Sequence, residues 1–164
     1  MSIAVRPRAW FFLVALICAC LLGFALYVQY RLFEDPCPLC VLQRVAFIWI
    51  GAMALIAFVH NPGRTGRTIY ALLLTLGGAA GTAVAGRHVW LQSLPSDQVP
   101  ECGAGLNYML ETMPFSQVLM KVFYGSGECA QIGWTFLGLS MPWWTLFWYI
   151  ALTVITWWVV TTRY

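Results

Sequence analysis

The chain contains little charge. Only 9% of its 164 residues are Asp, Glu, Lys or Arg, whereas 61% are hydrophobic. A soluble domain carries about a quarter charged residues, so this composition excludes an ordinary soluble protein and predicts that most of the chain faces lipid. The sequence also has no low-complexity tract and no internal repeat, and its net charge of +3 is no argument for a nucleic-acid partner.

Charge is absent from long stretches that are close to the roughly 20 residues needed to cross a bilayer as a helix. These apolar runs cover residues 9–29, 41–59, 68–86 and 143–162, and the second contains one charge, Arg44, near its start. The first run is too long for the apolar part of a cleaved signal peptide. We therefore predict an all-α membrane protein, in which four transmembrane helices form one domain over residues 1–164. The outer loops would be residues 30–40 and 87–142.

Acidic residues are missing from both termini and from the connection between the second and third runs. The charged residues of these segments are all basic, namely Arg6, Arg8, Arg64, Arg67 and Arg163. All six acidic residues of the chain lie in the other two connections. The positive-inside rule therefore predicts that both termini are cytoplasmic. Four cysteines would then lie on the outer side of the membrane: Cys37, Cys40, Cys102 and Cys129.

Two of these cysteines, Cys37 and Cys40, stand at the start of the second apolar run. Pro38 suits the first position of a helix, which places Cys37 near the N-cap and Cys40 near the third helical position. Unpaired backbone N–H groups and the helix dipole would stabilise a thiolate there. Arg44, one turn further, would add a positive charge on the face of Cys40. A structural disulfide is the alternative, but it gives no reason for an arginine in an apolar run.

The long outer loop contains Cys102 and Cys129. Between them, residues 114–123 have the apolar spacing of a short amphipathic helix, which we expect to lie flat on the membrane. Packing against a protein core is the alternative. Gly125 and Gly127 are expected to leave Cys129 mobile. Cys18 and Cys20, inside the first run, are two residues apart and cannot easily bridge, so we expect them to behave as small apolar residues.

Other cysteine chemistries fit the sequence less well. Cys37 and Cys40 have the spacing of half a zinc site, but the sequence shows no second half, so no metal is expected. Haem attachment requires histidine after Cys40, where Val41 stands. An oxidising compartment favours two disulfides, one at the helix end and one in the loop.

A disulfide at the membrane face can accept electrons from a soluble dithiol, but it must then be reoxidised. The sequence has no flavin, nucleotide or haem signature, and a membrane quinone is the acceptor that this position allows. His88 and Gln92, at i and i+4 beyond the third run, would face the same side at the outer interface. A solvated interfacial histidine is the alternative interpretation of His88.

These features resemble the disulfide bond formation protein B (DsbB) family over essentially the whole chain. The resemblance includes the four spans, and it includes the Cys-x-x-Cys motif with Leu42, Gln43 and Arg44 after it. It also includes the two loop cysteines, Gly133–Trp134 and the segment Phe136–Pro142.

The resemblance implies a four-helix bundle in the bacterial inner membrane. Such a protein reoxidises a periplasmic DsbA-like thiol oxidoreductase of thioredoxin fold and passes the electrons to ubiquinone or menaquinone. Alternatives within this chemistry are a relative dedicated to one substrate and a reductase. An alternative of another class is a non-enzymatic membrane scaffold with two inert disulfides, which would reduce no quinone when mixed with a reduced dithiol protein.

The resemblance also implies roles for single residues. Cys102 takes the attack of the partner's thiolate, and Cys129 is then released and joins Cys37. Cys40 becomes the thiolate that faces the quinone and is held by Arg44. Two further residues match positions near the quinone, His88 and Gln92.

Overall fold

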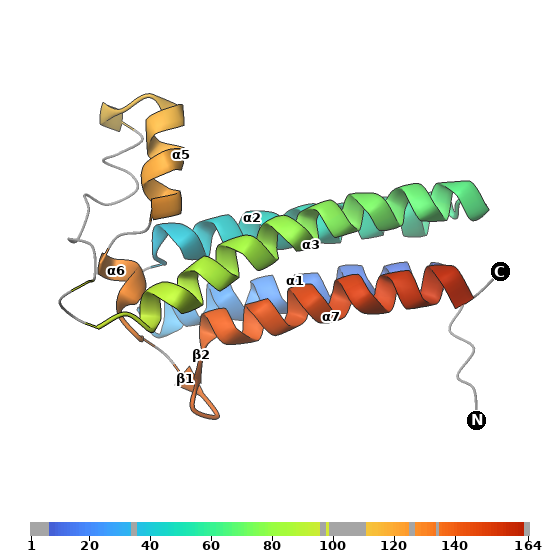
Figure 1. Cartoon of the computed structure of the whole chain (residues 1–164). Helices are drawn as coiled ribbons and strands as arrows, with labels where there is room; N and C mark the ends of the chain where they lie inside the picture. Colours follow the sequence, from blue (N-terminus) through green and yellow to red (C-terminus); the bar gives the residue numbers. More distant parts are fainter. Residues whose placement is uncertain are drawn as a thin grey trace.

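Four long helices lie side by side and form the body of the molecule (Figure 1). They are α1 (Pro7–Arg31), α2 (Pro38–His60), α3 (Arg64–Gln92) and α7 (Met141–Thr162). The computed structural model describes residues 7–33, 36–95, 98, 111–124, 127–133 and 135–162. Each of the four helices is long and apolar enough to cross a bilayer. The predicted all-α fold, a four-helix membrane bundle, is confirmed.

The helices extend beyond the apolar runs because local signals set their ends. In α2, Cys37 is the N-cap and Pro38 the first helical residue, as predicted. Asn61 ends α2 in the left-handed conformation, with φ 45°, a backbone region that asparagine tolerates better than most residues. In α3 the helix continues past the apolar run to Gln92, so His88 lies inside a spanning helix.

The smaller elements gather at the end of the bundle where α2 begins (Figure 1). They are α5 (Phe115–Tyr124), α6 (Gly127–Ala130) and a hairpin of β1 (Thr135–Phe136) and β2 (Leu139–Ser140). The two strands pair antiparallel, Thr135 with Ser140 and Phe136 with Leu139. Both turn residues have positive φ, 53° at Leu137 and 79° at Gly138, as a tight two-residue hairpin requires.

Helix α5 is the short amphipathic helix that the sequence predicts, and part of its apolar side packs on the bundle. Val118 and Val122 are buried in a cluster with Leu39, Leu91 and Cys129. For these two valines the alternative interpretation is therefore correct: they pack against the protein core and do not face the membrane surface. Contact of α5 with the membrane surface stays a prediction.

Glycines allow α3 to pack closely against both of its neighbours. A side chain at Gly78 would collide with Thr153, and one at Gly81 with the Tyr149 ring, both on α7. Gly77 instead faces α2. Although glycines four residues apart are a common packing motif in membranes, Gly77 and Gly81 serve different neighbours here. The pair that faces α7 is Gly78 and Gly81.

Candidate functional site

Cys37 and Cys40 lie at the first turn of α2 with their sulfurs in contact. The Cys37 thiol donates to Cys40 Sγ at 2.8 Å, and the Cys40 backbone N–H donates to Cys37 Sγ at 3.3 Å. Both are free thiols, so the pair that was predicted as a disulfide is here in its dithiol form. The sequence predicts that unpaired N–H groups lie beside this pair, and one of them, the Cys40 N–H, reaches the Cys37 sulfur.

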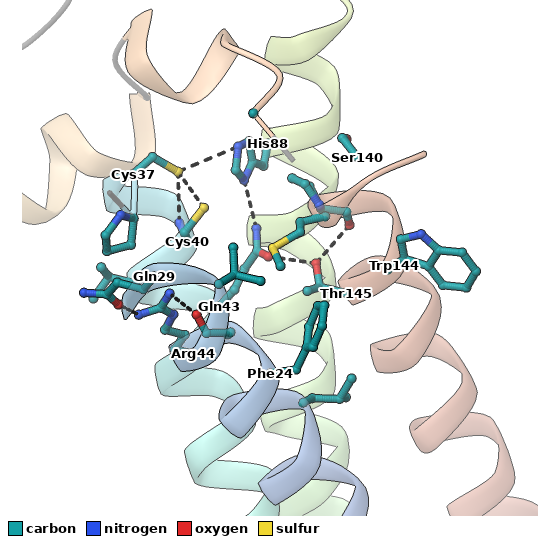
Figure 2. A pocket seen from close by; sticks show the side chains of 18 of the residues that line it. Phe24, Gln29, Cys37, Cys40, Gln43, Arg44, His88, Ser140, Trp144 and Thr145 are labelled. Carbon is teal, nitrogen blue, oxygen red and sulfur yellow. Dashed lines mark hydrogen bonds between the residues drawn. The ribbon is translucent and has the colours of Figure 1, made fainter. Parts of the chain in front are cut away.

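His88 reaches this pair from α3. Its Nε2 lies 3.8 Å from Cys37 Sγ, and its Nδ1 lies 3.1 Å from the side-chain nitrogen of Gln43. Gln43 in turn contacts the Thr145 hydroxyl on α7 at 2.7 Å. Figure 2 shows this chain of contacts running from the thiols into the bundle. His88 is 2% exposed, which excludes the alternative of a solvated interfacial histidine.

Cys129 meets the same pair from α6. It is fully buried and packs with Leu39 and Leu91, with Cys37 at the edge of the cluster. Side-chain hydrogen bonds of the Cys37 thiol with Cys129 and then with Cys40, together with burial, raise the pKa of that thiol. Cys129 is thus buried beside the helix-end pair, and the predicted mobility of its neighbourhood stays a prediction. Cys102 lies outside the described residues.

Arg44 is held by the neighbouring helix α1. Its guanidinium donates to Gln29 Oε1 at 2.5 Å and to the Ala25 carbonyl at 3.2 Å (Figure 2). Arg44 was expected to act on Cys40 directly, whereas its described hydrogen bonds go to α1. The two residues nevertheless line one cavity.

This cavity has a volume of about 1340 Å³ and lies between α1, α2 and α7. It is larger than the roughly 300–1,000 Å³ of common small-molecule sites. The predicted site residues that line it are Cys37, Cys40, Arg44, His88 and Gln92. Its aromatic lining comes from Phe24, Phe47, Trp144 and Trp148. The Ser140 hydroxyl donates to Gln92 Oε1 at 2.5 Å, which ties the hairpin to α3.

The sulfur and imidazole atoms also allow a test of the zinc alternative. Cys37, Cys40 and His88 bring three possible ligand atoms within 4.8 Å of one another. His88 lies far from Cys37 and Cys40 in the sequence, so the cysteine spacing gives no sign of this arrangement. Three donors are one short of a closed structural zinc site, and we assign no metal ligand among the described residues.

Several residues of the site were not predicted as site residues from the sequence. Gln43 and Thr145 are polar residues in or beside apolar runs, a signal that usually marks function or a hydrogen-bonded partner. Gln29 and Ser140 gave no comparable signal, because both lie near the ends of apolar segments where polar residues are common.

Comparison with known proteins places the chain in one family. The family model "Disulfide bond formation protein DsbB" matches residues 7–159. Disulfide bond formation protein B of Chromobacterium violaceum is 48% identical over 163 residues, which are 99% of this chain and 98% of that protein. The protein of the same name from Hahella chejuensis is 54% identical over 151 residues, 90% of each chain. That of Marinobacter nauticus is 48% identical over 156 residues, 94% of this chain and 93% of the relative. The chain therefore belongs to the DsbB family of membrane disulfide bond formation proteins, with the disulfide oxidoreductase activity that this membership implies.

Proposed function

We propose that this protein reoxidises a periplasmic thioredoxin-fold dithiol protein of the DsbA type and passes the electrons to a membrane quinone. The observation that carries the proposal is the position of the Cys37–Cys40 dithiol. It lines a large cavity between spanning helices, a position that suits a lipid-soluble electron acceptor. Membership of a disulfide bond formation family supports the thiol chemistry.

The cavity suits a quinone in shape and in chemistry. A quinone ring is flat and apolar, and its two carbonyl oxygens accept hydrogen bonds. Aromatic side chains such as Phe47 and Trp148 offer flat surfaces for the ring. Arg44 has five N–H groups, of which the described contacts with α1 use two, and His88 and Gln92 add polar groups. When bound, the quinone accepts two electrons and two protons.

The three described loop and helix-end cysteines support a relay by thiol exchange. Cys129 lies against Cys37, whereas Cys40 lines the cavity. When the helix-end pair is oxidised, the Cys129 thiolate attacks Cys37 Sγ and forms a Cys37–Cys129 disulfide. The Cys37–Cys40 bond breaks in this step, and Cys40 leaves as a thiolate beside the cavity. In this scheme Cys102 receives the partner, as the family resemblance implies.

The proposal includes an orientation in the bacterial inner membrane, with both termini cytoplasmic and the cysteine pairs periplasmic. Arginines without acids in the cytoplasmic segments support this orientation. An outer location also suits the chemistry, because disulfides persist in the periplasm and are rare in the cytosol.

The test is an assay with purified protein, a reduced thioredoxin-fold dithiol protein and a soluble quinone. We expect quinone loss, with one disulfide formed in the partner for each quinone reduced. Cys40→Ser should abolish the reaction. The matched control is Cys20→Ser, which changes an exposed cysteine on α1 and should leave the rate unchanged, as should Cys18→Ala. Folded protein that consumes no quinone would favour the scaffold alternative and contradict the proposal.

A further inference from the structure

A chain of buried polar groups joins α7 to the thiol pair through α2 and α3. It runs from Thr145 to Gln43 and His88, and it ends at Cys37 and Cys40. Gln43 is 4% exposed and His88 2% exposed. Buried polar groups without partners are costly, so each link of this chain must pair a donor with an acceptor. The direction of the donors can therefore be followed from one end to the other.

The side-chain amide of Gln43 is held at both of its ends. The Thr145 hydroxyl donates to Gln43 Oε1 at 2.7 Å. The same hydroxyl lies 2.9 Å from the Pro142 carbonyl, but that carbonyl belongs to α7, where a backbone N–H of the helix serves it instead. At the other end of the amide, Gln43 Nε2 lies 3.1 Å from Nδ1 of His88. An amide nitrogen can only donate, so Nδ1 of His88 is the acceptor.

The contact with Gln43 fixes the tautomer of His88. A neutral imidazole that accepts at Nδ1 carries its ring proton on Nε2. This nitrogen lies 3.8 Å from Cys37 Sγ, so its N–H donates to the thiol pair (Figure 2). The Cys37 thiol in turn donates to Cys40 Sγ at 2.8 Å. Every donor in the chain is therefore directed away from α7 and toward Cys40 Sγ.

A chain of donors with this direction favours a negative charge at its end. Hydrogen bonds to a charged acceptor are about twice as strong as neutral ones, so a donor beside the pair stabilises a thiolate more than a disulfide. Hydrogen bonds with Cys129 and then with Cys40, together with burial, raise the pKa of the Cys37 thiol. The reduced pair therefore keeps one proton when it ionises. Its single charge is shared through the contact of the two sulfurs, and the His88 N–H reaches the pair at Cys37.

We propose that Gln43 and Thr145 are positioning residues that hold His88 as an Nε2–H donor to the thiol pair. This donor stabilises the reduced, singly ionised pair relative to its disulfide, which makes the disulfide a stronger acceptor of electrons. The inference rests on the proposed thiol oxidase function, in which this pair takes up the electrons of a dithiol partner. It deepens that function by naming the groups that set the reduction potential of the pair.

The reduction that this donor favours balances in atoms and electrons. Two thiols of the reductant join in a disulfide and supply two electrons and two protons, while the bond between Cys37 and Cys40 breaks. One proton stays on Cys37, whose thiol donates to Cys40 Sγ. The other proton is released to water, and the pair keeps one negative charge. His88 gives up no proton in this step, because its N–H only donates a hydrogen bond.

The direct test reads the tautomer without quinone or partner. The chain contains two histidines, His60 and His88, so nitrogen NMR of reduced, ¹⁵N-histidine-labelled protein gives two sets of ring signals. The spectra are taken at about pH 8, where free histidine is neutral. His88→Leu identifies the His88 set by its loss. We expect a protonated Nε2 and an unprotonated Nδ1, and a protonated Nδ1 in the parent protein would overturn the inference.

Variants of the positioning residues separate this role from a purely structural one. Gln43→Glu keeps the shape, but a carboxylate can only accept, so we expect a proton on Nδ1 of the histidine. Thr145→Val removes the hydroxyl that holds the amide and should give a mixture of tautomers, whereas Thr145→Ser should keep the parent tautomer. The matched control on α7 is Thr153→Val, because the Thr153 hydroxyl donates to the Tyr149 carbonyl on its own helix. An unchanged tautomer in Gln43→Glu or in Thr145→Val would contradict the proposal.

The second readout is the redox equilibrium of the pair in quinone-free protein. Graded mixtures of reduced and oxidised glutathione set the equilibrium, and alkylation with peptide mass mapping measures the reduced fraction of Cys37 and Cys40. The titratable and charged groups that described neighbouring elements bring to the pair are His88, Cys129 on α6 and Arg44 in the same cavity. The variants of this test change only the first of these groups or its support.

His88→Leu removes the N–H without adding a charge. We expect it to favour the disulfide about 10-fold, which lowers the reduction potential by about 30 mV. Thr145→Val should change the equilibrium in the same direction by less, and Thr153→Val should leave it unchanged. An unchanged equilibrium in folded His88→Leu would overturn the inference. Because neither readout uses quinone or the partner, failure of quinone reduction would contradict the proposed function alone.

Discussion

At the scale of the residue, Arg44 illustrates how a charge is kept inside the apolar bundle. A bare guanidinium in lipid costs several kcal/mol, so its N–H groups need partners. Gln29 and the Ala25 carbonyl supply two from α1, and the rest of the side chain lines the cavity. The hydrogen bonds to α1 fix the position of the guanidinium. Because Arg44 also lines the cavity, a ligand there can accept hydrogen bonds from its remaining N–H groups.

We expect Arg44→Met to raise the KM for quinone about 10- to 100-fold, because hydrogen bonds to charged groups contribute about 1.5–3 kcal/mol. Disulfide exchange with the dithiol partner should remain. Steady-state assays with varied quinone give the KM, and thiol trapping gives the exchange rate. The charge-matched control is Arg31→Met, at the exposed end of α1. If Arg44→Met kept a normal KM but lost exchange, Arg44 would belong to the thiol exchange site instead.

At the scale of the element, α3 and α7 approach closely because glycine removes side chains between them. The partner of Gly81 is the ring of Tyr149, which is fully buried and stacks on Phe47 at a centroid distance of 4.2 Å. The Tyr149 hydroxyl also donates to the backbone carbonyl of Gln43 at 2.6 Å. The packing of α3 on α7 therefore supports the same residue, Gln43, that holds His88.

Gly81→Ala should destabilise the protein by about 1–3 kcal/mol, the usual cost of overpacking a core, because the Tyr149 ring cannot easily move away. Gly86→Ala is the control on the same helix, since a side chain there meets nothing within 4 Å. It should cause no loss of stability, because alanine is the better helix former. Thermal unfolding of both variants in one detergent measures the difference. Equal stability of the two variants would refute this account of the packing.

How much of these elements the sequence predicts depends on how local their signals are. Pro38 and Cys37 mark the start of α2 within a few residues, and the apolar runs mark the spans. The contact of Gln43 with His88 joins residues 45 positions apart, so only the packing of α2 on α3 reveals it. The hairpin of β1 and β2 escaped prediction because strands of two residues are too short to show alternation.

At the scale of the whole molecule, the chemistry lies at one end of the bundle. The first turn of α2, α6, the hairpin and the last turns of α3 meet there, while the connection from α2 to α3 lies at the other end (Figure 1). Arg64 and Arg67 begin α3 at that other end. The separation along the bundle agrees with the charge separation in the sequence, so one experiment on topology tests the location of all described site residues.

Reporter fusions after Arg64 and after Arg163 should read cytoplasmic, and a fusion near Gln98 should read periplasmic. The physical reason is that short loops rich in arginine resist translocation across the inner membrane. A fusion after Leu32, at the end of α1, provides the matched control, because it lies one span from the Arg64 fusion and should give the opposite reading. The reversed pattern would put Cys37 and Cys40 in the cytosol, where glutathione and thioredoxin keep thiols reduced. A net flow of electrons from a periplasmic dithiol to quinone through this pair would then be impossible, whatever the geometry of the site.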